Sequence, residues 1–222
     1  MKEKQHSENL NNTKSHLQDS KEKTIDTSDR EFHALLRQMI IERLEQNHFA
    51  NALGAKIEMI KHQKSVVSLL VSEQHLNPNG VVHGGVLMTL ADTAAGNCMI
   101  YLGQPTATID LSYRFLQPVF AGDLLVGKAR VIQSGKTVIV VEINLYVINQ
   151  SGCANIVDLV DSSAEDFEQK LIGVATASFF RRDRHLPELS PEILDLADRF
   201  IRDYIAKKSE YSTKSQDKQR EV

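Results

Sequence analysis

The sequence predicts an α+β fold in which an antiparallel sheet wraps around one long central helix, with extra helices toward both ends of the chain. Three observations predict it. Six segments have the alternating or β-branched pattern of strands, one nearly unbroken apolar run between them has helical character, and amphipathic helical patterns lie on both sides of this set. A single very apolar helix among antiparallel strands is typical of a sheet wrapped around that helix.

The strand candidates come as two before the apolar helix and four after it. The first two are "AKIEMIKH" and "KSVVSLLVSE", and the other four cover 106–118, 123–133, 137–149 and 171–182. Turn residues separate the later strands, among them Pro118, Gly122 and the "SGK" turn at 134–136. An acidic segment at about 151–170 does not fit a strand pattern, and we expect it to be an insertion in a hairpin.

The central helix is expected from His83 to about Leu102. A loop bearing Asn and Pro, "QHLNPNGVV", precedes it and brings a His-Gly-Gly sequence to its first turn. Gly103 and Pro105 are expected to end it.

Two further helices are expected to flank a domain at 48–185. Residues 1–27 are polar, and we expect a disordered tail there. An amphipathic helix follows within 28–47, because Ser28 and Glu31 match a capping box and apolar residues recur at helical spacing. Within 186–222, Ser190 and Pro191 begin another amphipathic helix, which a charged tail follows. We expect both helices to cover the sheet or the edges of a dimer.

Composition narrows the class of protein. The 222-residue chain has a net charge of −3, which argues against a nucleic-acid binder that depends on overall positive charge. The N-terminal residues lack the apolar core of a secretory signal, and no apolar segment is long and charge-free enough to span a bilayer, so a cytoplasmic protein is predicted. Cys98 and Cys153 match neither a disulfide framework nor a metal-site spacing, and no metal is expected.

One carboxylate, Asp92, lies in the middle of the apolar helix. Burying an unpaired carboxylate costs several kcal/mol or forces it to take up a proton, so a sequence that keeps one there usually needs it. At the start of the helix, Gly84 and Gly85 offer backbone N–H groups that could hold an oxyanion of a reacting acyl group. Asp92 follows Gly84 by eight residues, about 12 Å along a helix, so the two cannot readily meet at one carbonyl. Two antiparallel copies of the helix could bring them together, which predicts a homodimer with two identical sites.

The segment "LNPNGVVHGGVLMTLADTAAG", with "FLQPVFAGDLLVGKARVIQSGKTVIVVEINLYV" downstream, resembles the hot-dog-fold acyl-CoA thioesterases of the phenylacetate-pathway (PaaI-like) type. The resemblance covers about Phe49 to Arg181 and rests on an Asn, the His-Gly-Gly turn and an Asp nine residues past that His. It implies a hot-dog fold, active sites at a dimer interface, and dimers that commonly pair into tetramers. Both terminal helices and the longer 151–170 segment depart from the family pattern.

The resemblance also implies a role for each matching residue. Asp92 is the catalytic carboxylate, acting as nucleophile or as general base, and the Gly84 N–H polarises the thioester carbonyl. Asn77 helps to position the thioester or the water, and His83 supports the loop. Thr108 matches a position where a hydroxyl orients water. The turn Ser134, Gly135 and Lys136 resembles the loop that meets the CoA nucleotide.

These residues together predict an acyl-CoA thioesterase that hydrolyses an acyl-CoA to free acid and CoA without a cofactor. A non-catalytic acyl-CoA sensor or scaffold and a dehydratase or hydratase on the same fold stay open as alternatives. Purely structural roles also stay open for four of these residues. Asp92 could be a partly exposed acid bonded to a Thr or Asn, Asn77 a loop cap, Thr108 a plain strand residue and Lys136 an exposed turn lysine. The acyl group stays open among short, medium, long and aromatic groups.

Overall fold

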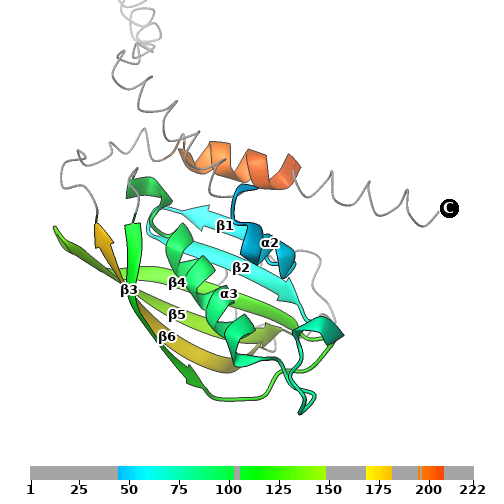
Figure 1. Ribbon diagram of the computed structural model, residues 1–222. Coiled ribbons are helices and arrows are strands. Elements are labelled where there is room, and N and C mark those ends of the chain that lie inside the picture. The colour runs from blue at the N-terminus through cyan, green and yellow to red at the C-terminus, as the bar shows by residue number, and fades with distance from the viewer. Residues whose placement is uncertain (1–44, 103–105, 149–168, 182–194, 196, 208–222) are drawn as a thin grey trace, which may run out of the picture.

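One six-stranded antiparallel sheet and a single long helix across its face organise the chain (Figure 1). The computed structural model describes residues 45–102, 106–148, 169–181, 195 and 197–207. The strand order is β1-β2-β4-β5-β6-β3. The strands are β1 Lys56–Lys61, β2 Lys64–Leu70, β3 Thr106–Phe115, β4 Leu124–Ser134, β5 Val138–Ile148 and β6 Gln169–Arg181. The predicted α+β class, the six strands and the central helix are confirmed.

The central helix, α3 (Gly84–Asn97), lies close to the sheet because its buried face is built from small residues. Ala91, Ala94 and Ala95 have no exposed surface. On the sheet side, Gly127 of β4 faces the helix, and a Cβ at that position would lie 3.8 Å from the Ala94 Cβ. Alanine and glycine therefore let α3 approach the sheet, and larger side chains fill the core around this contact.

α3 ends earlier than the sequence predicts. The α-helix ends at Asn97, and a short 3₁₀ turn, η2 (Ile100–Leu102), follows. The backbone N–H groups of Cys98 and Met99 donate to Ala95 and Gly96, three residues back rather than four. The apolar run continues across this change, so periodicity alone could not locate it.

Two short helices before α3 were not predicted from the sequence. α2 (His48–Ala52) forms where a connecting segment was expected, because the Asn47 side chain caps the N–H of Ala50, and five residues are too few for a periodic pattern. The 3₁₀ helix η1 (Glu73–His75) lies at the start of the predicted loop. Most of the predicted helix at 28–47, the predicted tail at 1–27 and nearly all of the 151–170 insertion lie outside the described residues.

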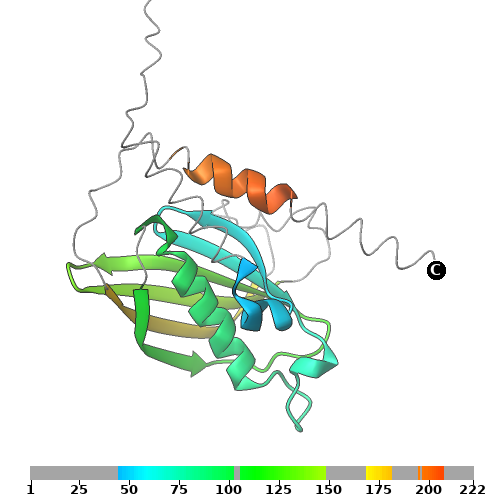
Figure 2. The same cartoon turned by 45° about the horizontal axis from the view of Figure 1, so that its top comes forward.

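The C-terminal helix covers one edge of the sheet. Its described residues 197–207 lie alongside β1 in both views (Figures 1 and 2). Buried Ala197 and Ile201 pack against Ile60 of β1 and Tyr101 of η2, and the Tyr101 hydroxyl donates to Asp198. Edge strands expose unpaired backbone groups, so this helix shields the β1 edge, as expected for a terminal helix.

The opposite edge strand, β3, has no neighbour on its outer side among the described residues. It pairs only with β6, and its side chains are largely exposed, with Ile109 at 57% and Phe115 at 56%. A β-bulge at Ile109 interrupts the pairing between Thr108 and Asp110. The extra residue changes the alternation, so that Thr108 points to the same face as Leu111 and Tyr113, the face that α3 covers.

Candidate active site

The predicted residues near α3 fall into two groups, one at the start of the helix and one near its middle. Asn77, His83, Gly84 and Gly85 lie at its first turn, and Asp92 lies two turns further along. Since α3 is one uninterrupted helix from Gly84 to Asn97, the eight residues between Gly84 and Asp92 correspond to about 12 Å. Within one chain, the glycine turn and the carboxylate therefore lie too far apart to act on one carbonyl group.

The turn before α3 is held by a buried histidine that the sequence analysis did not assign to the site. His75 is 2% exposed, its Nδ1 accepts the Ser72 N–H at 2.9 Å, and its Nε2 donates to the Leu53 carbonyl at 2.9 Å. Its own carbonyl accepts the His83 N–H at 2.8 Å, which closes the loop that carries Asn77. Its only sequence signal was its place just before that loop, and one of its partners, Leu53, lies at the end of α2, far from it in the chain.

The first turn of α3 offers one backbone donor without an acceptor in the described part of the chain. The Gly85 N–H donates to His83 Nδ1 at 3.1 Å, and the Val86 N–H donates to the His83 carbonyl at 2.9 Å. No described residue accepts the Gly84 N–H. A helix N-terminus combines such donors with the positive end of the helix dipole, so the Gly84 N–H can bind a developing oxyanion.

Asp92 has a hydroxyl partner on the edge strand. It is half-buried rather than fully buried, and the Thr108 Oγ1 donates to its Oδ1 at 3.1 Å. The bulge at Ile109 is what directs Thr108 to this side of the sheet. A carboxylate beside a hydroxyl at a partly open surface can accept a proton from a water molecule held between them.

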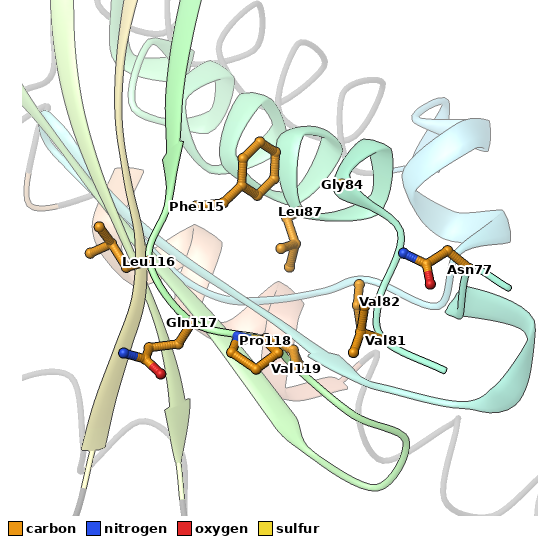
Figure 3. A pocket seen from close by; sticks show the side chains of 10 residues that line it. All are labelled: Asn77, Val81, Val82, Gly84, Leu87, Phe115, Leu116, Gln117, Pro118 and Val119. Carbon is orange, nitrogen blue, oxygen red and sulfur yellow. The ribbon is translucent and has the colours of Figure 1, made fainter. Parts of the chain in front are cut away.

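A cavity of about 460 Å³ opens beside the first turn of α3 (Figure 3). Its walls come from the loop before α3, from α3 itself and from the end of β3 with the turn that follows. The lining residues are Asn77, Val81, Val82, Gly84, Leu87, Phe115, Leu116, Gln117, Pro118 and Val119. The Asn77 Oδ1 accepts the Asn79 N–H at 2.8 Å, which leaves the amide nitrogen as its donor toward the cavity.

The predicted CoA-binding turn, residues 134–136, lies at the opposite end of the sheet from the cavity. Ser134 ends β4, and Gly135 leaves no room for a side chain, because a Cβ there would lie 2.8 Å from the Val138 carbonyl oxygen. The Ser134 Oγ accepts a hydrogen bond from Arg181 Nη2 at 2.8 Å. Arg181 pairs with Thr106 across the strands and so shares the face that carries Thr108.

Arg181 is a second residue that the sequence analysis left unassigned. Its Nε is buried without a hydrogen-bond partner in the described structure, and so is the Oγ1 of its cross-strand neighbour Thr106. The guanidinium donates to Ser134, and the Arg181 backbone N–H donates to the carbonyl of Thr137, the neighbour of Lys136, so this group of residues suits an anion. At the end of a strand, the arginine gave no sequence signal beyond its charge. No three His, Cys, Asp or Glu side chains among the described residues come together as metal ligands.

Known proteins resemble the chain in sequence and in structure. The family model described as "Thioesterase superfamily" matches residues 79–154. Acyl-coenzyme A thioesterase PaaI of Escherichia coli (strain K12) is 36% identical over 106 residues, 48% of this chain and 74% of that protein. The structure of the E. coli PaaI protein from the phenylacetic acid degradation operon aligns with a TM-score of 0.56 and 26% identity, covering 70% of this chain and 99% of that one.

A hypothetical thioesterase from Streptococcus pneumoniae TIGR4, solved with coenzyme A, aligns with a TM-score of 0.51 and 25% identity. The alignment covers 64% of this chain and 99% of that one. Both solved structures therefore match this chain over nearly their whole length, whereas about a third of this chain extends beyond them. No described helix is long and apolar enough to cross a membrane.

Proposed function

Because the chain belongs to the thioesterase superfamily, and within it to the hot-dog-fold acyl-CoA thioesterases of the PaaI type, we propose that it hydrolyses an acyl-CoA thioester at a site shared by two chains. The observation that carries this proposal is the separation of Gly84 from Asp92. Gly84 has a backbone N–H that no described residue accepts, and Asp92 has the Thr108 hydroxyl beside it. One uninterrupted helix nevertheless keeps the two residues about 12 Å apart.

A second copy of the chain completes the site if two α3 helices lie antiparallel across a two-fold axis. Gly84 of one subunit then faces Asp92 of the partner subunit, and the arrangement occurs twice. The two edges of the sheet support this pairing. The C-terminal helix covers β1, whereas no described residue covers the edge of β3 or the apolar Ile109. An open edge of this kind is a template for pairing with another chain.

In the proposed reaction, the thioester carbonyl oxygen accepts the Gly84 N–H, because His83 already accepts the Gly85 N–H. Asp92 of the partner subunit takes a proton from a water that its Thr108 helps to orient, and the water oxygen bonds to the carbonyl carbon. The carbon–sulfur bond then breaks, and the sulfur leaves with the electron pair and receives the proton from the carboxyl group. In the alternative route the Asp92 carboxylate itself attacks, expels the CoA thiolate, and water hydrolyses the resulting anhydride.

The remaining residues bind the substrate in this proposal. The Asn77 amide holds the thioester or the water beside Gly84, and the cavity receives the acyl group. Ser134, Gly135 and Lys136, together with Arg181, bind a phosphate group of CoA. The reaction needs no metal or separate cofactor, since water, the carboxylate and the backbone donor supply all of its steps.

Two matched pairs of variants test the two halves of the site in a CoA-release assay with a thiol reagent. Asp92→Asn should lower kcat by at least about 100-fold, while Asp110→Asn, which changes an exposed carboxylate on the edge strand β3, should not. Gly84→Pro removes the donor N–H, and the extended backbone of His83 tolerates a following proline. It should cost about 10²–10³ in rate. Gly84→Ala keeps the N–H, and its Cβ would lie 3.1 Å from the Phe115 Cζ, a contact that a small shift of the partly exposed ring relieves, so it should cost much less.

Mixed dimers test whether the site is shared. Co-expressed Asp92→Asn and Gly84→Pro chains, isolated with two different tags, form one intact site per heterodimer if Gly84 and Asp92 come from different subunits. About half of the wild-type activity should return. Heterodimers as inactive as either parent would rule out the shared site. Acyl-CoA binding without CoA release by the wild type, across a broad panel, would instead favour the non-catalytic sensor.

A further inference from the structure

We infer that Phe115 selects the acyl group by excluding acyl chains that branch at the carbon next to the carbonyl, and that the cavity accepts only uncharged acyl groups. This inference rests on the proposed function, because it takes the thioester carbonyl to bind at the Gly84 N–H. It adds a substrate class and a selecting residue to that function.

The Phe115 ring lies directly against the residue that supplies the donor. An ideal Cβ on Gly84 would meet the ring at 3.1 Å from Cζ and 3.2 Å from Cε1, so the ring packs on the Gly84 Cα. Both residues line the cavity together with Leu87, and Figure 3 displays the ring next to the first turns of α3. A carbonyl bound at the Gly84 N–H therefore places the adjoining carbon of the acyl group next to this ring.

Although Phe115 is 56% exposed, two sets of contacts limit how far its ring can move. The Tyr113 ring lies 4.5 Å from it, centroid to centroid, at an angle of 49°. Tyr113 in turn fills the space above Gly173, where an added Cβ would meet its hydroxyl oxygen at 1.9 Å. The Leu116 and Gln117 N–H groups both donate to the Ile172 carbonyl, at 2.9 and 3.2 Å, which fixes the backbone just after Phe115. A second substituent on the adjoining carbon would thus meet a wall that is held in place.

The chemistry of the lining excludes charged acyl groups. Every described residue that lines the cavity is apolar or, like Asn77 and Gln117, carries an uncharged amide. An acyl group that ends in a second carboxylate would lose its hydration there without gaining a counter-charge. We therefore expect simple monocarboxylic acyl-CoAs as substrates and dicarboxylic ones to be rejected.

Two isomeric substrates isolate the branching effect. Butanoyl-CoA and 2-methylpropanoyl-CoA have the same atoms and charge and differ only in the branch. Wild-type protein should favour butanoyl-CoA in kcat/KM by about tenfold or more, the usual effect of one misplaced methyl group in a tight pocket. Phe115→Ala should raise the ratio of branched to straight kcat/KM at least tenfold, and Phe115→Leu should give an intermediate ratio.

Phe120→Ala is the matched control, because this aromatic side chain on the following turn is 51% exposed and does not line the cavity. Its substrate ratio should equal that of the wild type. A ratio that Phe115→Ala changes by less than twofold, in a folded dimer that still cleaves butanoyl-CoA, overturns the selecting role and leaves the thioesterase proposal intact. Equal cleavage of succinyl-CoA and butanoyl-CoA overturns the exclusion of charged groups. A wild type that cleaves no acyl-CoA at all overturns both the function and this inference.

Discussion

Substituting alanine for Gly173 should destabilise the protein, because the new methyl group would occupy space that Tyr113 already fills. An ideal Cβ at position 173 would lie 1.9 Å from the Tyr113 hydroxyl oxygen, 2.4 Å from Cζ and 2.9 Å from Cε1. Contacts below 3 Å of this kind do not persist, so the ring must swing away from β6. Phe115, which stacks on the ring, would lose its support at the same time.

The size of the effect follows from three contributions. Overpacking at a buried site costs about 1–3 kcal/mol, and the lost contact between the two aromatic rings adds about 0.5–1.5 kcal/mol. In the other direction, Gly173 has no positive φ, so alanine fits the backbone and restricts the unfolded chain, which returns about 0.4–1 kcal/mol. The free energy of unfolding should therefore fall by about 0.5–4 kcal/mol.

Urea unfolding at one fixed protein concentration measures this loss, since the midpoint of an oligomer depends on concentration. Tyr113→Leu provides the second arm of a double-mutant cycle. In that background Gly173→Ala should cost little, because the clashing ring is gone. An unchanged midpoint for Gly173→Ala, or the same loss with and without Tyr113, would refute the steric explanation.

Two further predictions follow from single side chains. Burial raises the pKa of the Cys98 thiol to about 12. In native protein at pH 8, a thiol reagent should therefore leave Cys98 unmodified, whereas in urea-unfolded protein Cys98 should react. Peptide mass spectrometry measures the modification. Because this folded pKa is higher than the unfolded value of 9.0, the stability that the thiol contributes should be fully retained below pH 9 and decline from pH 9 toward 12. The free energy of unfolding of Cys98→Ala should decline less between pH 9 and 10. Arg181→Gln should raise KM for an acyl-CoA about fivefold or more. The KM for the corresponding acyl-pantetheine should not change, because this shorter substrate lacks the phosphates. An equal rise of KM for both substrates would mean that Arg181 has a structural role.

The residues of the proposed site differ in how far the sequence could locate them. The His-Gly-Gly turn and Asp92 lie on one helix, and helical geometry alone converts their spacing into a distance. That Thr108 bonds to Asp92 depends on the bulge at Ile109, which the alternating pattern of β3 does not reveal. Without the bulge, Thr108 and Leu111 would lie on opposite faces of the strand.

The sequence by itself determined the elements, and the spacing of Gly84 and Asp92 led to the prediction of a second chain at the site. Periodicity marks six strands and one apolar helix, because the spacing of apolar residues reflects which local structure can bury them. Only the tertiary structure decided which residues meet: Phe115 with Gly84, Tyr113 with Gly173, and Arg181 with Ser134. Each of these contacts joins elements far apart in the chain, and cross-strand register, bulges and helix-to-sheet packing set them. These are properties of paired surfaces, which the local pattern of one segment does not contain.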